Sequence, residues 1–352
     1  MQQFALISIL VVAVALAAWV LLITRNGKRV TPQGSGTVSL PAGDFEGLPL
    51  PDYAARAITG DYRSYLVEVE PGIKVHVLEV GEGYPVFLQH GNPTSGLLYR
   101  KVAARLPTER LRLIMPTLVG LGFSSKIPAN EHTLRNHMRW INTVLQRLEL
   151  RELVYVGQDW GGPAGLGALA LSPELLRGAV LLNTGFRAPT EKRAISKIHE
   201  RVKTPVLGEL IVERSGQFFP RLRGIQGDPA SLPDDVLDLY RRPLLESGNC
   251  KAPLAMMRMV PDGPDHPSSE AMRFIGDYVA SLDIPAEIVW GMKDPILGGL
   301  LDAMRENFPR ARVTETPAGH FLQEEVPDEI AAAILRVVDA AQLGTENLSP
   351  RP

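Results

Sequence analysis

The stretch from Leu153 to Leu166 constrains the fold of this chain most strongly. It begins with a short apolar run, Leu-Val-Tyr-Val, that has the length and composition of a buried strand. The sequence Gly-Gln-Asp-Trp-Gly-Gly follows, and a helical segment begins after it. The glycines at 157, 161 and 162 indicate a tight turn with no room for Cβ atoms. A strand, a sharp turn and a helix in this order form a nucleophile elbow, which presents a reactive side chain above a parallel sheet.

The central residue of this turn is Asp159. A carboxylate there can attack carbon directly and form an ester that water then cleaves. A serine at the same place is typical of an esterase or lipase, so Asp159 excludes a serine-type esterase. The structural alternative is that Asp159 only caps the helix that follows. The motifs described below favour the nucleophile.

Short apolar runs alternate with amphipathic stretches along most of the chain. An antiparallel strand pair is predicted on either side of Pro71-Gly72. Six further strands are predicted at 86–88, 111–114, 153–156, 179–182, 288–290 and 313–314, with helical patterns such as 134–148 and 328–341 between or after them. Buried strands separated by helices indicate an α/β protein whose mostly parallel, eight-stranded sheet is flanked by helices. The alternation stops between about 187 and 277, which predicts a helical cap over the carboxyl edge of the sheet.

The composition excludes several functional classes. The 352 residues are 45% hydrophobic and 22% charged, and the formal net charge is −2. Because the basic residues are scattered and balanced by acids, no nucleic-acid partner is predicted. The single cysteine, Cys250, cannot form an internal disulfide and fits neither a zinc site nor a thiol redox pair. No His, Cys and Asp cluster has metal-ligand spacing, so we expect neither a metal nor a cofactor.

Residues 1–24 predict a membrane anchor. The run 4–23 is apolar and uncharged, and its length matches the roughly 20 residues that a helix needs to cross a bilayer core. A cleaved signal peptide is the alternative, but no basic residue precedes the run. Arg25, Lys28 and Arg29 follow it, and this charge asymmetry predicts a cytoplasmic catalytic part. An extracytoplasmic catalytic part is the opposite orientation.

These patterns divide the chain into six segments. They are a membrane anchor (1–24), a linker rich in Gly, Pro and Ser (25–50), the first part of an α/β core (51–186), a helical cap (187–276), the second part of the core (277–343) and a tail (344–352).

Three further motifs follow predicted strands and bring polar groups to the sheet edge that carries Asp159. The sequence from His90 to Ser95 forms a turn that can present a backbone N–H as half of an oxyanion hole. The N–H of Trp160 would supply the other half. Asp294 and His320 each follow a later strand. The order nucleophile, acid, base is that of the α/β-hydrolase fold, which predicts a triad of Asp159, Asp294 and His320.

The histidines and Asp294 also have structural alternatives. Asp294 precedes a proline, an arrangement that is typical of a simple turn. Only His320 follows the last strand behind a glycine, and the other two triad positions are filled independently, which favours it as the base. His90 is expected to brace its turn, and His76 lies within a strand. The remaining four, His132, His137, His199 and His266, are expected to be solvated.

Five motifs together resemble the haloalkane dehalogenases, a family of α/β hydrolases. They are GQDWGG at 157–162, HGNPTS at 90–95, GLGFS at 120–124, GMKD at 291–294 and GHFLQE at 319–324. The resemblance covers about 51–341. The glycines at 120 and 122 are shared by many α/β hydrolases, whereas Asn92 together with Trp160 is the specific signal. Alone, Asn92 could hold its turn and Trp160 could line the core.

The resemblance implies a two-step reaction without metal or cofactor. Asp159 would displace halide from a carbon of a small halogenated hydrocarbon, while the neutral N–H donors of Asn92 and Trp160 hold the halide. His320, oriented by Asp294, would then activate water to hydrolyse the alkyl-enzyme ester. The backbone N–H groups of Asn92 and Trp160 would stabilise the oxyanion of this second step.

Subgroups of this family differ in the position of the acid. After the strand at 179–182 the chain reads Asn183-Thr184-Gly185, without Asp or Glu, so Asp294 is the predicted acid. An acid in this later position with an Asn–Trp halide pair resembles the third subgroup of the family. Thr117 stands where relatives usually carry Asp, and we expect it to change only the local turn.

Two alternatives stay open. An epoxide hydrolase shares the fold and the nucleophile, but its leaving oxygen needs a proton, usually from cap tyrosines. Tyr240 and Tyr278 lie in or beside the predicted cap, although Asn92 favours the dehalogenase. The second alternative is a membrane-tethered homologue without turnover, against which the complete triad argues. Phe218, Phe219, Leu244 and the methionines at 256–259 are expected to shape an apolar pocket.

Overall fold

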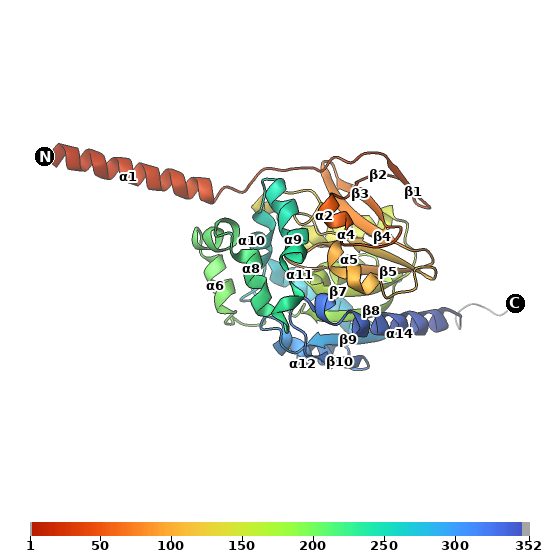
Figure 1. Cartoon of the computed structure of the whole chain (residues 1–352). Helices are drawn as coiled ribbons and strands as arrows, with labels where there is room; N and C mark the ends of the chain where they lie inside the picture. Colours follow the sequence, from red (N-terminus) through yellow and green to blue (C-terminus); the bar gives the residue numbers. More distant parts are fainter. Residues whose placement is uncertain (1, 347–352) are drawn as a thin grey trace.

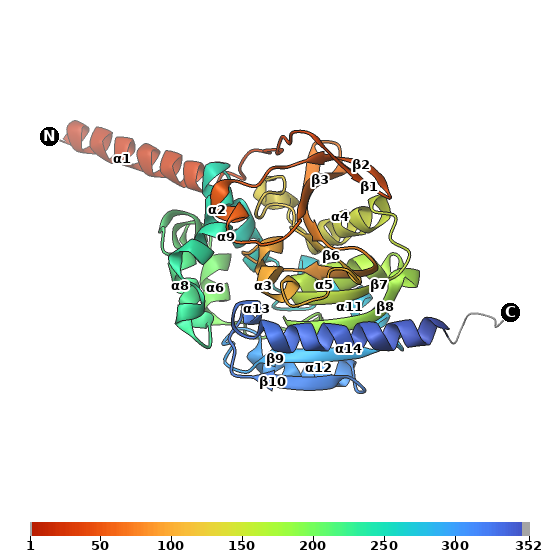
Figure 2. The same ribbon diagram turned by 45° about the vertical axis from the view of Figure 1, so that its right-hand side comes forward.

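A computed structural model of the chain describes residues 2–346, with side chains described for 12–343. One sheet runs through the molecule, and helices lie on both of its faces (Figures 1 and 2). Its strands are β1 (Thr37–Leu40), β2 (Gly43–Gly47), β3 (Arg63–Glu70), β4 (Ile73–Val80), β5 (Tyr84–Gln89), β6 (Leu111–Pro116), β7 (Leu153–Asp159), β8 (Leu176–Thr184), β9 (Ala286–Gly291) and β10 (Arg312–Thr316). The predicted α/β-hydrolase fold with a mostly parallel sheet is confirmed.

The strands lie in the order β1-β2-β3-β4-β6-β5-β7-β8-β9-β10. Neighbours from β6 to β10 are parallel, whereas β1 to β4 and the β4–β6 pair are antiparallel. Each of the eight predicted strands is present. The hairpin β1–β2 adds two more strands from within the stretch 25–50, which the sequence analysis described only as a linker.

The helices of the described residues are α1 (Gln2–Ile23), α2 (Asp52–Ala55), α3 (Arg100–Ala103), α4 (Leu134–Arg147), α5 (Gly161–Ala170), α6 (Lys197–Lys203), α7 (Leu207–Glu209), α8 (Phe218–Arg221), α9 (Asp234–Glu246), α10 (Lys251–Arg258), α11 (Pro267–Ala280), α12 (Leu301–Asn307), α13 (Leu322–Glu325) and α14 (Pro327–Glu346). The helices α6 to α10 form one group at the side of the sheet (Figure 1). We call this group the cap helices.

Alternation along the central strands divides the core into two layers. Val154 and Val156 of β7 face one cluster of buried side chains, which includes Ile334 and Val338 of α14. Tyr155, between them, faces the other cluster, which includes side chains of α4, α5 and α11. Successive side chains of a strand point to opposite faces of the sheet, so each fully buried strand contributes to both layers. The sheet is therefore covered on both faces, and its carboxyl edge is left for the site.

The predicted membrane anchor is wrong. In the part of the chain that the structure describes, no helix combines the length and the apolar character needed to cross a membrane. The membrane partner and the cytoplasmic orientation, which both depended on this anchor, are corrected with it.

The segment after α1 lies against the cap helices and the core. The Nζ atom of Lys251 in α10 donates to the carbonyl of Ile23 at 3.2 Å. The Asn249 amide donates to the carbonyls of Lys28 at 2.7 Å and Ile127 at 3.2 Å. Val30 forms an isolated antiparallel bridge with Lys126. These contacts fasten the residues directly after α1 to both parts of the molecule.

Candidate active site

The turn after β7 holds Asp159 in a conformation that few residues adopt. Its φ is 49°, in the left-handed region, which is uncommon for a residue with a side chain and recurs at functional sites. A Cβ atom on Gly161 would collide with the carbonyl of Gln89, and one on Gly162 with the hydroxyl of Thr184. The two glycines therefore let α5 begin close to the ends of β5 and β8. The Asp159 side chain consequently extends from the carboxyl edge of the sheet and lines the cavity described below.

The Asp159 carboxylate is held from two sides. Its Oδ1 accepts a hydrogen bond from the backbone N–H of Asn92 at 2.8 Å, and the backbone N–H of Trp160 also bonds to the carboxylate. Its Oδ2 lies 3.7 Å from Nε2 of His320. Burial raises the pKa of Asp159, although His320 and both backbone N–H groups act in the opposite direction. The carboxylate thus lies in a dry place where N–H groups stabilise its charge.

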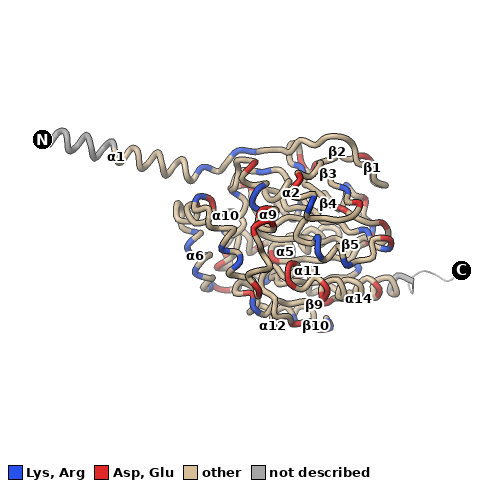
Figure 3. Tube along the Cα trace, viewed as in Figure 1, with Lys and Arg blue, Asp and Glu red and all other residues tan. Residues whose placement is uncertain are grey.

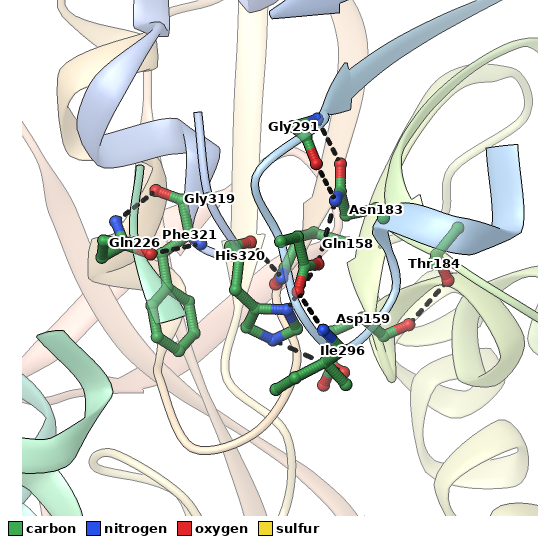
Figure 4. Close-up of polar contacts among 12 residues, drawn as sticks. Gln158, Asp159, Asn183, Thr184, Gln226, Gly291, Ile296, Gly319, His320 and Phe321 are labelled. Atoms are coloured by element: carbon green, nitrogen blue, oxygen red, sulfur yellow. Dashed lines mark hydrogen bonds and ion pairs between the residues drawn. The ribbon is translucent and has the colours of Figure 1, made fainter. Parts of the chain in front are cut away.

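His320 and Asp294 form a buried pair. The ring of His320 also lies beside Asp159 (Figure 4). The Nδ1 atom of His320 lies 2.9 Å from Oδ2 of Asp294, which assigns the ring proton to Nδ1 and leaves Nε2 facing Asp159. Burial alone would lower the pKa of His320, but Asp294 and Asp159 raise it above its ordinary value. Burial likewise acts to raise the pKa of Asp294, but His320 and hydrogen bonds from Ile296 and Asn183 hold it below its ordinary value.

Asn183 helps to position the acid Asp294, and the sequence alone did not predict this role. Its side-chain Nδ2 donates to Oδ2 of Asp294 at 2.9 Å and to the carbonyl of Gly291 at 3.0 Å. Its Oδ1 accepts from the N–H of Gly291 at 2.6 Å. Asn183 therefore ties the end of β8 to the loop that carries the acid. The signal in the sequence is a polar residue at the end of a buried strand, although that position by itself indicated only that no acid is present there.

The side chains of Asn92 and Trp160 line the same cavity as Asp159 and His320. The indole of Trp160 is 7% exposed, and its N–H has no hydrogen-bond partner among the described residues. The Asn92 amide donates one N–H to the carbonyl of Pro253, in α10, at 3.1 Å, which leaves its second N–H free. Four of the five predicted site residues thus line one cavity, and the fifth, Asp294, is connected to it through its hydrogen bond with His320.

This cavity has a volume of about 650 Å³ and lies between the sheet edge and the cap helices. Its walls are mainly apolar and include Phe186, Phe218, Ile225, Met257, Met272 and Leu300. Of the residues that were predicted to shape such a pocket, Phe218 and Met257 line it, whereas Phe219, Leu244, Met256 and Met259 do not. In contrast, Tyr240 and Tyr278 do not line it, because Tyr240 donates to the buried carboxylate of Glu324 at 2.7 Å and Tyr278 lies in α11 beside the core. No tyrosine is among its lining residues in the described chain.

Three of the four histidines that were expected to be solvated are placed differently, whereas His76 and His90 lie where the sequence predicted. His132 and His137 were expected to be solvated, but both are buried and their rings stack at 5.4 Å. His199 in α6 is partly buried, lines the cavity and bonds through Nδ1 to the Ser196 hydroxyl at 2.7 Å. Burial, Lys203 and His320 lower its pKa to about 4. Within the described residues, no group of three or more His, Cys, Asp and Glu side chains is placed to hold a metal ion.

Comparison with known proteins places the chain in a family. The family model described as alpha/beta hydrolase fold matches residues 84–327. Haloalkane dehalogenase 2 of Mycobacterium tuberculosis is 30% identical over 272 residues, which cover 74% of this chain and 90% of that protein. The chain belongs to the haloalkane dehalogenase family of α/β hydrolases. The crystal structure of the dehalogenase DatA from Agrobacterium tumefaciens C58 superposes on this family member with a TM-score of 0.71 at 27% identity, over 80% of this chain and 99% of that one.

A protein whose name gives a different activity is also similar to this chain. The cis-3-alkyl-4-alkyloxetan-2-one decarboxylase of Shewanella oneidensis is 27% identical over 290 residues, which cover 79% of this chain and 89% of that protein. That protein acts, by its name, on a strained four-membered lactone with two alkyl groups.

Proposed function

We propose that this chain hydrolyses carbon–halogen bonds, with Asp159 as the nucleophile. The observation that best supports this proposal is that one carboxylate and two side-chain N–H donors, from Asn92 and Trp160, line a single apolar cavity. A halide that leaves from carbon needs no proton, only donors directed at the developing negative charge in a dry site. Asp159 forms a C–O bond to the substrate carbon as the C–halogen bond breaks. The halide departs with the electron pair toward Asn92 and Trp160.

In the second step, water cleaves the alkyl-enzyme ester. His320 takes a proton from water through Nε2, and Asp294 stabilises the imidazolium that results. The backbone N–H groups of Asn92 and Trp160 support this step, because they already contact the Asp159 carboxylate and would stabilise an oxyanion on the same carbon. With the acid after β9 and an Asn–Trp halide pair, we assign the chain to the third subgroup of the family. We also propose that the division into core (51–186 and 277–343) and cap (187–276) separates catalysis from substrate selection.

Halide release from 1,2-dibromoethane and 1-bromobutane tests this function. The full chain should release bromide continuously, and Asp159→Asn should release none. His320→Gln should release about one bromide per protein molecule and then stop, because its ester cannot be hydrolysed. Mass spectrometry of this variant would show the alkyl group on the peptide that contains Asp159. Absence of bromide release by the folded wild-type protein would refute the proposal.

Ring-opening of an oxetan-2-one is a second candidate, favoured by the similarity to the decarboxylase from Shewanella oneidensis. Here Asp159 would attack the alkyl carbon of the lactone, and the C–O bond would break to give a carboxylate, which also needs no proton. The C–C bond to this carboxylate would then break with loss of CO₂. Its electron pair would form the double bond of an alkene as the C–O bond to Asp159 breaks. The carboxylate of Asp159 would be regenerated without water.

The two candidates differ in their need for His320. Dehalogenation requires His320 in its hydrolytic step, whereas the decarboxylation sequence requires no base. With cis-3,4-dialkyl-oxetan-2-one as the substrate, His320→Gln should therefore keep forming alkene if the second candidate holds. Epoxide hydrolysis has no such support, because no tyrosine of the described chain lines the cavity to protonate the leaving oxygen.

A further inference from the structure

The charges that line the cavity are strongly unequal. Asp159 is its one acidic residue among those described, whereas three arginines, Arg187, Arg193 and Arg221, also line it. Arg187 forms an ion pair with Glu306 at 3.1 Å. The guanidinium of Arg193 contacts only the carbonyl of Pro261, at 3.4 Å, and the Arg221 side chain has no hydrogen bond or ion pair with a described residue. Two guanidinium groups are thus without a carboxylate partner at an otherwise apolar cavity.

The chain segment that contains these arginines also has an excess of positive charge. Between 187 and 225 the chain has nine Lys and Arg residues against four Glu, although its overall net charge is −2. Basic residues lie along α6, at the edge of the cap helices (Figure 3), and include Arg201 and Lys203 of its last turn. A cleft lined by one sign of charge and by low-dielectric walls concentrates the opposite charge. The part of the cavity that Arg193 and Arg221 line therefore favours an anion, whereas its apolar walls favour an alkyl chain.

A small neutral haloalkane uses neither the size nor the charge of this cavity. A volume of about 650 Å³ would hold roughly 20 groups of the size of a water molecule or a methylene, at about 30 Å³ each. Arg193 and Arg221 are exposed residues of the cavity wall, whereas Asp159 is partly buried at the sheet edge. A substrate that contacts Asp159 and these arginines must lie along the mainly apolar walls of the cavity, which suits an alkyl chain.

We propose that Arg193 and Arg221 form a binding subsite for the carboxylate of a haloalkanoate that carries its halogen at the far end of an alkyl chain. This inference rests on the proposed function and specifies its substrate class. The planar guanidinium group can bind a carboxylate through two parallel hydrogen bonds. The halogen-bearing carbon lies at Asp159, where a C–O bond forms and the halide leaves. Hydrolysis of the ester by water then gives an ω-hydroxyalkanoate and regenerates Asp159.

The first test compares matched pairs of substrates. Bromide release is measured for 4-bromobutanoate, 6-bromohexanoate, 8-bromooctanoate and 10-bromodecanoate against the 1-bromoalkanes with the same number of carbons. The wild-type protein should prefer the acid at one or two of the longer lengths. For that acid, the double variant Arg193→Gln/Arg221→Gln should lose about five- to tenfold in kcat/KM, mainly through KM, as expected for partly exposed ion pairs. Its kcat/KM for the bromoalkane should not change.

Arg201→Gln is the matched control, because Arg201 lies in α6, between Arg193 and Arg221 in the same basic segment, but does not line the cavity. It should leave both substrates unaffected. Equal losses for acid and alkane in the double variant, or no preference for any acid, would overturn the subsite. A preference for the acid that persists in the double variant would also overturn the subsite.

A binding measurement separates this proposal from the proposed function. Calorimetry with Asp159→Asn should detect binding of decanoate that weakens about five- to tenfold when Arg193 and Arg221 are also replaced by Gln. Arginine-dependent binding of decanoate without bromide release by the wild type would support the subsite while refuting the dehalogenase. Binding of decanoate that is indifferent to both arginines would refute the subsite even if bromide is released.

Discussion

His90 connects a buried imidazole to the nucleophile through a single peptide group. Its Nε2 accepts from the N–H of Leu118 at 3.0 Å, so the ring proton is on Nδ1, which lies 2.7 Å from the carbonyl of Gly91. That carbonyl and the N–H of Asn92 belong to the same peptide group. Because the N–H bonds to Oδ1 of Asp159 at 2.8 Å, the ring of His90 fixes the direction of an oxyanion donor without touching substrate.

Replacement of His90 should therefore affect the hydrolytic step more than ester formation. We expect His90→Gln to slow ester hydrolysis by roughly 10²-fold or less, below the loss of a complete oxyanion donor. The alkyl-enzyme ester should then accumulate during steady turnover of 1-bromobutane, which mass spectrometry of the quenched protein would show. His76→Gln, another buried histidine, controls for general loss of stability. Equal slowing in both variants, without accumulated ester, would contradict the positioning role.

The protonation state of His320 sets the pH dependence of the same step. Its pKa lies above the ordinary 6.5, and it accepts a proton from water only when neutral. Ester hydrolysis should therefore decrease as the pH falls through this raised pKa. In Asp294→Asn, the acid limb should shift to lower pH, and the rate at the plateau should fall because the imidazolium loses its partner. An acid limb that does not move in Asp294→Asn would show that another group titrates.

At the scale of elements, a buried ion pair of the core accepts a hydrogen bond from a tyrosine of a cap helix and so links the two parts. Glu324 of α13 accepts two hydrogen bonds from Arg100, at 2.6 and 2.9 Å, and one from Tyr240 of α9 at 2.7 Å. All three side chains are buried, and Nζ of Lys101 also lies 3.0 Å from Glu324, so removal of the Glu324 charge leaves two cations without their carboxylate partner. We expect Glu324→Gln to lower the free energy of unfolding by about 3–5 kcal/mol, and Tyr240→Phe by about 1 kcal/mol.

Tyr240→Phe also tests the position of Tyr240 outside the cavity. Bromide release by this variant should equal that of the wild type at a temperature where both are folded. Urea unfolding measures the two stabilities, and the same samples serve for the activity assay. A large loss of activity in Tyr240→Phe, without a comparable loss of stability, would place the tyrosine in the reaction after all.

The elements also show what the sequence could predict. Asp159, Asp294 and His320 could be assigned because each follows a strand, and the carboxyl ends of parallel strands share one edge of the sheet. The hairpin β1–β2 was missed because Gly, Pro and Ser dominate its neighbourhood, while its stability comes from pairing with β3. The roles of Asn183 and His199 depend on contacts across more than a hundred residues or on the fold of the cap helices. Local patterns do not contain such contacts.

Across the whole molecule, buried histidines couple stability to pH. Burial lowers the pKa of His76 and His137 to about 3 and that of His90 to about 4, and it holds the pKa of His132 below its ordinary value. In the unfolded chain these groups take up protons near pH 6.5. Between pH 6.5 and about 3 the unfolded state therefore binds more protons than the native state. Their contribution to stability is complete above pH 6.5 and is lost as the pH falls.

This linkage predicts steep acid destabilisation at mildly acidic pH. Each histidine that stays neutral in the native state contributes about 1.4 kcal/mol per pH unit, so His76, His132 and His137 together contribute about 4 kcal/mol per unit near pH 5. His320 opposes them, because its raised pKa adds stability below pH 6.5 that is lost at higher pH, but it is one group against several. Urea unfolding between pH 5 and 7 measures the slope in a range where ordinary carboxylates contribute little. His137→Gln should reduce this slope by about one proton, whereas His266→Gln, at a less buried position, should reduce it less. A slope that is the same in wild type and His137→Gln would mean that His137 is protonated in the native state.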